Sequence, residues 1–341
     1  MSDPIVSFKN VDIVFGGRPE TALPMIDAGE SRENILRETG QTLGVTGANF
    51  DITEGEVVVL MGLSGSGKST LLRAVNGLNP VIRGSVEVRD GENWVNPETC
   101  SPEALRHLRR HRIGMVFQQF ALLPWRTVAE NVGFGLELSG MPKAERAGKV
   151  EAQLKLVGLA GWGEKYVHEL SGGMQQRVGL ARAFATDAPI LLMDEPFSAL
   201  DPLIRDRLQD ELLDLQKELN RTIIFVSHDL DEAAKIGSRI AIMEGGRVIQ
   251  LGTPQEIVKR PATDYVADFV GHMNPLNVLR ARDIMGPVRP GGLAEAPRCT
   301  PETTVRAVIA QKRTANGSAI LVEQNGKILG QIGEQEIYAC L

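Results

Sequence analysis

The chain has 341 residues, a formal net charge of −6, 43% hydrophobic residues and 23% charged residues. This composition is ordinary for a globular protein, and the acidic balance argues against a nucleic-acid partner, which usually requires a basic surface. No apolar run reaches the roughly 18 residues of a membrane-spanning helix, and residues 1–9 lack the pattern of a secretory signal. We therefore expect a protein of the cytoplasm whose cysteines, Cys100, Cys299 and Cys340, are reduced.

The first part of the chain alternates strand and helix patterns. Strand character over Val6–Phe15 and Asn49–Ile52 flanks a polar stretch, broken by Gly and Pro, in which a short helix is expected over Ser31–Glu38. Further along, short apolar runs predict buried strands separated by helical patterns. These runs are Val57–Met61, Ile113–Phe117, Ile190–Met193, Ile223–Val226 and Ile240–Met243. Such alternation predicts an α/β domain around a mostly parallel sheet, which we place at residues 1–271.

Two helices of this domain have clear start signals. The glycine-rich segment after Val57–Met61 leads into a helix over Lys68–Val75, ended by Gly77. Asp201 and Pro202 form an N-cap and first-turn pair, and apolar residues then recur at steps of three and four up to Leu219.

A smaller unit is predicted after the Asn274–Pro275 break. Its pattern indicates a helix over Val305–Lys312 and strands over Ala319–Glu323 and Ile328–Ile332, joined by a hairpin turn at Asn325–Gly326. Residues 272–341 are therefore expected to form a small α+β domain.

The segment Gly62–Ser69 fits the phosphate-loop pattern G-x-x-x-x-G-K-[ST], and it follows a strand and opens a helix. Glycines there let backbone N–H groups surround phosphate oxygens, and the helix N-terminus adds positive potential. We expect Lys68 to reach the β- and γ-phosphates and the Ser69 hydroxyl to bind Mg²⁺. The predicted phosphate-binding residues are Ser64, Gly65, Ser66, Gly67, Lys68, Ser69 and Thr70. The alternative is a chance glycine-rich turn.

An acidic pair, Asp194 and Glu195, follows the buried strand pattern Ile190–Met193. A carboxylate leaving such a strand beside a phosphate loop can hold Mg²⁺, a role we predict for Asp194. Glu195 is the predicted general base that polarises an attacking water. The alternative is a helix N-cap before Pro196.

The segment Leu170–Gln176, which reads LSGGMQQ, resembles the signature sequence of the ABC ATPase family. Other family elements stand in order around it, and the resemblance extends from Phe15 to about residue 270. They are the Q-loop residue Gln118, the D-loop residue Asp201, the switch histidine His228 and Phe15 at the position of the adenine-stacking aromatic.

This resemblance implies a P-loop ABC-type nucleotide-binding domain with a helical subdomain at about 119–180. It implies ATP hydrolysis with Mg²⁺, in which Glu195, His228 and Gln118 are catalytic. The implied metal site combines Ser69, Gln118 and Asp194. In the family the signature closes over ATP on a second subunit, so Ser171, Gly172, Gly173 and Gln175 are expected to complete the ATP site of a second copy.

Further likenesses point to one branch of the family. Phe120–Val128 resembles importer subunits, in which this region receives a short helix of the membrane permease. The insertion between Phe15 and Asn49 resembles the glycine betaine, proline betaine and choline importers, and its segment Ala22–Gly29 is most similar to choline-type members. In the tail, Ala281–Met285 and the strands after it resemble one CBS motif, a regulatory or dimerisation unit.

The resemblance therefore implies the ATP-hydrolysing subunit of a quaternary amine importer. Its expected partners are a second copy, permease subunits and, indirectly, an extracytoplasmic substrate-binding protein, and its expected place is the cytoplasmic face of the bacterial inner membrane. Trimethylamine N-oxide is the alternative cargo. The alternatives from other classes are a soluble ABC ATPase of DNA repair or translation and a P-loop kinase. His107 and His111 could form a metal pair, but neighbouring arginines favour a solvated basic helix face.

Overall fold

The computed structural model describes residues 3–271, 273–289, 296–314 and 319–339, so Cys340 lies outside the described residues. The chain forms two compact units, one of residues 1–228 with 241–249 and one of residues 229–240 with 250–341. No helix of the described residues combines the length and apolar character needed to cross a membrane.

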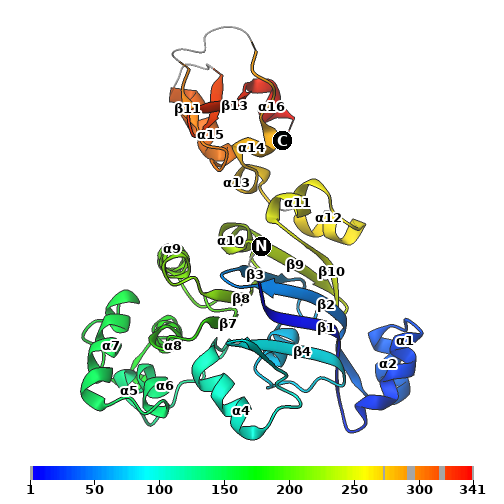
Figure 1. The fold of residues 1–341 in the computed structure, drawn as a ribbon, viewed down its shortest axis with the longest axis vertical. Helices are drawn as coiled ribbons and strands as arrows, with labels where there is room; N and C mark the ends of the chain where they lie inside the picture. The colour runs from blue at the N-terminus through cyan, green and yellow to red at the C-terminus, as the bar shows by residue number, and fades with distance from the viewer. Residues whose placement is uncertain (1–2, 272, 290–295, 315–318, 340–341) are drawn as a thin grey trace. The chain divides into compact units, whose positions relative to one another are not determined.

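The first unit contains an antiparallel sheet in the order β2-β1-β4-β5 (Figure 1). Its strands are β1 (Pro4–Phe15), β2 (Thr42–Thr53), β4 (Arg83–Asp90) and β5 (Asn93–Val95). The predicted first strand is confirmed, whereas β2 begins seven residues before the predicted start at Asn49. The strand patterns of the sequence did not include β4 or β5.

A second sheet has the order β10-β9-β3-β8-β7-β6. Its strands are β3 (Val57–Met61), β6 (Ile113–Val116), β7 (Ile190–Asp194), β8 (Thr222–Val226), β9 (Arg239–Glu244) and β10 (Arg247–Gly252). Strands β3, β8, β7 and β6 are parallel, and every residue of β3, β7 and β8 is buried. The predicted parallel core is therefore confirmed, because continuous apolar runs fit strands covered on both faces.

Helices of the first unit surround these sheets. They are α3 (Lys68–Ala74), α4 (Pro102–His107), a π-helix (Leu108–Arg112), α5 (Val128–Val132), α6 (Phe134–Leu138), α7 (Lys143–Leu156), a 3₁₀ turn (Val167–Glu169), α8 (Gly172–Ala185) and α9 (Pro202–Leu219). Asp201 caps α9, since its side chain accepts a hydrogen bond from the backbone N–H of Ile204 at 3.0 Å. Helices α5, α6 and α7 each contact α8 and form a mainly helical part of the unit.

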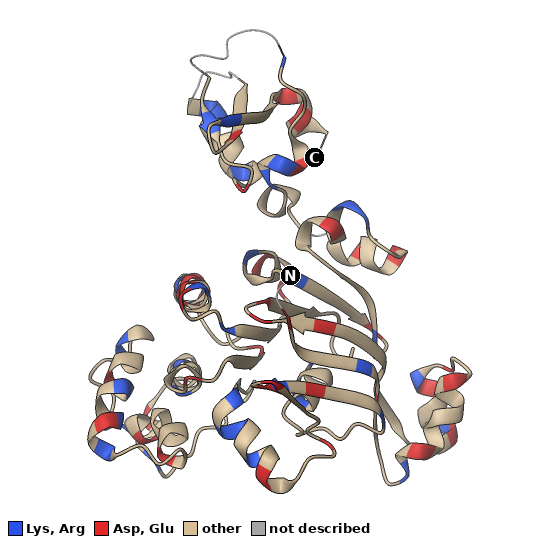
Figure 2. Ribbon diagram, viewed as in Figure 1, with Lys and Arg blue, Asp and Glu red and all other residues tan. Residues whose placement is uncertain are grey.

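The basic segment with the two histidines forms α4 and the π-helix, and the ribbon of this segment carries several blue positions, the colour of Lys and Arg, in Figure 2. The rings of His107 and His111 lie 4.9 Å apart, and Nε2 of His107 is 3.3 Å from a carboxylate oxygen of Asp90. Within the described residues, no cluster of three or more His, Cys, Asp or Glu side chains could hold a metal ion.

The insertion between β1 and β2 is folded. It contains a 3₁₀ turn (Pro19–Ala22), α1 (Leu23–Asp27) and α2 (Arg32–Thr39), which begins after the N-cap Ser31. The expected helix is therefore confirmed. A small apolar cluster joins the insertion to the sheet, and it consists of Val14, Ala22, Ile26, Ile35 and Leu43.

The second unit is built mainly from short helices and one small sheet. Its helices are α10 (Leu230–Ile236), α11 (Pro254–Lys259), α12 (Asp264–Val270), α13 (Pro275–Val278), α14 (Ala281–Ile284), α15 (Val305–Thr314) and α16 (Glu334–Tyr338). The sheet has the order β11-β12-β13, with strands β11 (Arg298–Cys299), β12 (Ile320–Gln324) and β13 (Lys327–Ile332). The predicted hairpin is confirmed, since β12 and β13 pair antiparallel across Asn325–Gly326.

The tail has its own apolar core. This core contains Ala281, Cys299, Val308, Ile320, Val322, Ile332 and Ile337. Helix α13 also contacts α10 and α11, so the residues expected from 272 onward share a compact unit with earlier helices.

Candidate functional site

An open cavity of about 640 Å³ lies at the phosphate loop of the first unit. Ten of its lining residues were predicted from the sequence: Phe15, Ser64, Gly65, Gly67, Lys68, Ser69, Thr70, Gln118, Glu195 and His228. Six others were not: Arg32, Glu33, Leu36, Thr42, Leu43 and Gly44. The cavity therefore joins loops far apart in the sequence, and it includes residues of the insertion.

The phosphate loop curls around the ammonium group of Lys68. This group donates hydrogen bonds to the backbone carbonyls of Gly62 and Leu63, both at 2.9 Å. Burial lowers the pKa of Lys68, while the nearby carboxylates of Glu195 and Asp194 act to raise it. Gly67 has a φ of 101°, and a Cβ there would lie 2.5 Å from the carbonyl oxygen of Gly44. Only glycine fits this turn into α3 without strain.

Asp194 is fully buried at the end of β7, where both of its carboxylate oxygens are engaged. Oδ1 accepts a hydrogen bond from the Ser69 hydroxyl at 2.6 Å, and Oδ2 pairs with a guanidinium nitrogen of Arg73 at 2.8 Å. The sequence prediction had missed Arg73. Its signal is the i, i+4 spacing from Ser69 on α3, which puts the two side chains on one face.

Glu195, Gln118 and His228 lie together at one edge of the parallel sheet. Each follows a strand of that sheet, since Gln118 comes after β6, Glu195 after β7 and His228 after β8. Oε2 of Glu195 accepts a hydrogen bond from the Gln118 amide at 3.2 Å and lies 3.7 Å from Nδ1 of His228. The φ of Glu195 is 49°, a sparsely populated conformation for a residue other than glycine. Such strain is typical of functional sites.

The signature residues do not line this cavity. Ser171 caps α8 through a 3.4 Å hydrogen bond from the N–H of Met174, and Ser171 and Gly172 are exposed, while Gly173 follows in the same turn. The Gln175 amide donates to the carbonyls of Val167 and Leu170, at 3.1 and 3.2 Å. The signature helix therefore begins outside the cavity that the chain's own phosphate loop lines.

Two further family positions have local structural partners. Asp201 is exposed as the cap of α9 and does not line the cavity. Gln176, which the sequence prediction did not single out, is buried; it donates to the carbonyl of Glu195 at 3.3 Å and accepts from the N–H of Ala199 at 3.0 Å. This amide ties the signature helix to the loop that carries Glu195.

A second cavity of the first unit, of about 370 Å³, is mainly apolar, and we call it the apolar groove. Its apolar lining residues are Leu78, Ile113, Met115, Phe117, Ala121, Leu123, Phe134, Leu138 and Ala183. Arg182 holds the adjoining loop, since its guanidinium donates to the carbonyls of Phe120 and Ala121 at 2.8 and 2.7 Å. Both of those residues have positive φ, at 59° and 46°, so the loop is strained at this point.

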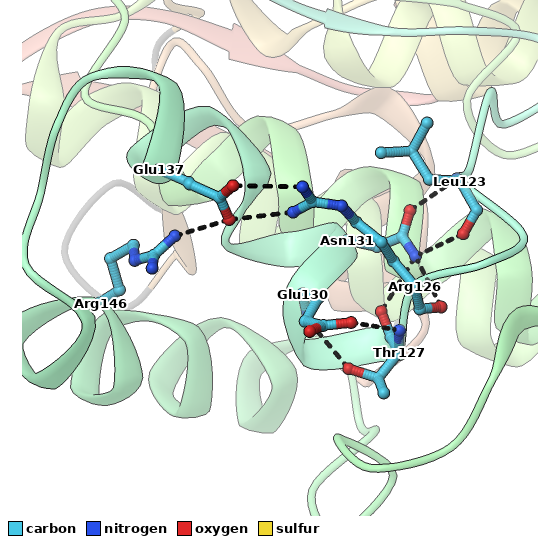
Figure 3. Close-up of polar contacts among 7 residues, drawn as sticks. All are labelled: Leu123, Arg126, Thr127, Glu130, Asn131, Glu137 and Arg146. Atoms are coloured by element: carbon cyan, nitrogen blue, oxygen red, sulfur yellow. Dashed lines mark hydrogen bonds and ion pairs between the residues drawn. The ribbon is translucent and has the colours of Figure 1, made fainter.

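Polar contacts beside the groove fix the segment Leu123–Thr127 (Figure 3). The fully buried Asn131 side chain accepts from the N–H of Leu123 at 2.8 Å and donates to the carbonyls of Leu123 and Thr127 at 3.1 and 2.9 Å. Arg126 pairs with Glu137 and stacks 4.9 Å from the ring centroid of Phe134. One wall of the groove is thus held by buried and surface polar groups.

A phosphate loop, a buried aspartate, a strained glutamate and a separate signature helix define an ABC-type ATP-binding cassette. Comparisons agree, since the family model described as ABC transporter matches residues 45–198. The glycine betaine transport ATP-binding protein OpuAA of Bacillus subtilis (strain 168) is 46% identical over 96% of this chain and 76% of its own length. The trimethylamine N-oxide transport system ATP-binding protein TmoW of Pelagibacter ubique (strain HTCC1062) is 40% identical over 99% of this chain and 97% of its own.

A solved structure is similar as well. The dimeric post-hydrolysis structure of the ATP-binding cassette MJ0796, bound to ADP and Pi, matches with a TM-score of 0.63 and 31% identity, covering 73% of this chain and 98% of that one. The chain belongs to the ABC transporter family, in the group of ATP-binding subunits that includes the glycine betaine importers. It is an ATPase coupled to solute import.

Proposed function

We propose that this ATPase drives uptake of a quaternary amine, namely glycine betaine, proline betaine or choline, through a permease dimer. The observation that supports this choice of cargo is the similarity to OpuAA over nearly the whole chain, insertion and tail included. The likeness to TmoW makes trimethylamine N-oxide the second candidate. A trimethylated cationic head is common to glycine betaine and choline, and an external binding protein can recognise it with aromatic side chains.

In the nucleotide cavity, the triphosphate of ATP is proposed to lie on residues 64–70, with Phe15 against the adenine. The Phe15 side chain supports this role because it is partly exposed and lines the cavity rather than the core. Lys68 then exchanges the carbonyls of its own loop for phosphate oxygens. A bound anion would also raise the pKa of this buried ammonium.

A magnesium ion fits the residues at the end of β7. Ser69, Asp194 and the amide oxygen of Gln118 offer only oxygen ligands, and Mg²⁺ is commonly held by one or two protein oxygens with water and phosphate. When bound, it would neutralise charge on the β- and γ-phosphates. The Ser69 hydroxyl oxygen lies 2.6 Å from Oδ1 of Asp194, so two of these oxygens already lie side by side.

Hydrolysis is assigned to Glu195 as general base. Its carboxylate faces the cavity between Gln118 and His228, both of which are close enough to orient a water or a γ-phosphate oxygen. This placement at three neighbouring strand ends keeps the three side chains together, and the signature residue Gln176 adds a hydrogen bond to the backbone carbonyl of Glu195.

The signature is proposed to serve the ATP of a second copy. Ser171, Gly172, Gly173 and Gln175 do not line the chain's own cavity, yet a helix start with exposed hydroxyl and N–H groups suits an anion. Two copies arranged head to tail would give two shared sites, with Asp201 at the same interface. The dimer would close on ATP and open after hydrolysis.

The apolar groove is proposed to receive a short permease helix at the cytoplasmic face of the bacterial inner membrane. An amphipathic helix needs an apolar groove with polar edges, and Arg109, Arg110 and Arg182 also line this one. The single CBS-like tail is proposed to support dimerisation or regulation.

The test is reconstitution with the permease and matched binding protein in liposomes. We expect glycine betaine to stimulate ATP hydrolysis. Stimulation by trimethylamine N-oxide alone would change the proposed cargo and leave the assignment as an importer subunit unchanged. Failure to associate with the permease, with ATP turnover intact in the isolated subunit, would overturn the importer function.

A further inference from the structure

Helix α2 of the insertion lies at the nucleotide cavity, although no nucleotide motif covers it. Three of its residues line the cavity: Arg32, Glu33 and Leu36. The cluster of Ala22, Ile26 and Ile35 with Val14 and Leu43 anchors this helix against β1 and β2. The part of the cavity lining that α2 provides therefore belongs to the folded unit.

Arg32 ties α2 to the phosphate loop. Its guanidinium donates hydrogen bonds to the carbonyl oxygens of Gly65, in the loop, and Gly44, in β2. The side chain is half-buried, and burial lowers its pKa; the guanidinium nevertheless stays protonated, as arginine does in proteins. A fixed positive charge thus holds the carbonyl of Gly65 next to the N–H groups expected to face phosphate.

Leu36 follows Arg32 by one helical turn, so both side chains lie on one face of α2. It is 49% exposed, which is unusual for a leucine that lines a cavity, and Phe15 is 37% exposed in the same cavity. Gly44, which also lines the cavity, lies against the Phe15 ring, since a Cβ on Gly44 would lie 2.9 Å from a carbon of that ring. Phe15, Leu36 and Leu43 are the large apolar side chains among the residues that line this cavity, and the phosphate loop lines it as well.

We infer that α2 is the base-side wall of the nucleotide site. Leu36 contacts the adenine of a bound nucleotide, and Arg32 is a positioning residue that holds the phosphate loop. This inference rests on the proposed placement of ATP in the same cavity. It assigns the insertion, which resembles the branch rather than the whole family, a part in nucleotide affinity.

Leu36 is tested by comparing two ligands, ATP and inorganic tripolyphosphate, each with Mg²⁺. Leu36→Ala should weaken ATP binding by about tenfold, since burial of a leucine side chain is worth that order, and leave tripolyphosphate binding unchanged. Leu219→Ala is the matched control, because Leu219 is 48% exposed at the end of α9 and should change neither ligand. Wild-type ATP affinity in Leu36→Ala, or an equal loss for both ligands, would overturn the base contact.

Arg32 is tested with the same two ligands. Arg32→Gln should weaken ATP and tripolyphosphate by the same factor, and Arg32→Lys should recover part of the loss. A loss confined to ATP, or no loss, would overturn the positioning role.

Lys68→Ala separates this inference from the proposed site. If it binds both ligands like the wild type, the cavity is not the nucleotide site and the proposed function loses its placement of ATP. If it loses both ligands while the Leu36 and Arg32 variants bind normally, only the inference about α2 is overturned.

Discussion

The nucleotide cavity and the apolar groove belong to the same unit but are built by opposite means. In the cavity, charged groups converge from strand ends that are distant in sequence, and Asp194 makes its two contacts 125 and 121 residues away. In the groove, apolar side chains form the surface, and the buried Asn131 holds backbone only four to eight residues away. In the proposed function, the cavity binds and hydrolyses ATP, and the groove provides an apolar surface for a partner.

This difference predicts how each region responds to substitution. If the cavity binds ATP as proposed, a group in it acts directly on the reacting molecule, so its loss should reduce turnover by orders of magnitude. A group beside the groove acts through the conformation of Leu123–Thr127, so its loss should appear first as lower stability and weaker coupling to the permease. The four variants below test this contrast, from the largest expected effect to the smallest.

Lys68→Ala should have the largest effect. It removes the cation enclosed by the carbonyls of Gly62 and Leu63, so ATP binding should weaken and turnover should fall at least about 100-fold. Phosphate release and nucleotide binding measure the two losses. Lys143→Ala, an exposed lysine at the start of α7, removes the same charge and should behave like the wild type. Normal hydrolysis by Lys68→Ala would show that Lys68 has no role in ATP hydrolysis.

Glu195→Gln should separate binding from chemistry. The amide keeps the shape of the side chain but cannot accept a proton, so turnover should fall by about 10²–10⁴-fold while ATP still binds. With ATP and Mg²⁺, size-exclusion chromatography should show an accumulated dimer. Turnover close to that of the wild type would assign the general base to another group.

Many of the residues that line the cavity were predictable because they stand in contiguous motifs beside apolar strands. Gly62–Ser69, Glu195 and His228 each follow a buried strand, which fixes their common edge of the sheet. Arg32 was not predictable, since its partner Gly65 is 33 residues away and no pattern links them. Asn131 reads in the sequence as an ordinary helix residue, and only the packed loop makes it buried.

The parallel sheet was predictable for the same reason, and the antiparallel sheet was not. Strand β2 contains Gly44 and Gly47, which are typical of a loop. In β4, the buried Val86 and Val88 alternate with half-buried polar and charged residues. Their pairing with β1 depends on contacts between distant segments rather than on local pattern. Local propensity is weak evidence for such strands.

Asn131→Ala should change stability more than chemistry. The substitution leaves the N–H of Leu123 without its partner, at a cost of about 1–3 kcal/mol in the free energy of unfolding. The carbonyls of Leu123 and Thr127 each lose one hydrogen bond but keep the bond from a backbone N–H. Urea unfolding measures this loss, and Asn93→Ala, at an exposed position in β5, is the control. If the groove receives the permease, the ratio of permease-stimulated to basal turnover should fall as well. An unchanged unfolding midpoint would show that these hydrogen bonds do not hold the segment.

Glu137→Gln should have the smallest effect, and one that depends on pH. Hydrogen bonds from Arg126 and then Arg146 lower the pKa of Glu137 from 4.5 to about 2. A carboxyl whose pKa is lower in the folded state stabilises that state above its unfolded pKa, and the contribution disappears as the carboxylate is protonated. The unfolding midpoint of Glu137→Gln should therefore lie slightly below that of the wild type at neutral pH, with the difference vanishing between pH 4.5 and about 2.

The matched control for this last variant is Glu145→Gln. Glu145 is an exposed carboxylate on α7, the helix that also carries Arg146, so both variants change the net charge equally. Surface ion pairs contribute little because water and salt screen them, and added salt should shrink the effect of Glu137→Gln further. If both variants shift the midpoint alike across the pH range, the effect is one of total charge. A shift confined to Glu137→Gln would instead show that the pairing of Glu137 with Arg126 and Arg146 stabilises the folded state, and with it the segment beside the groove.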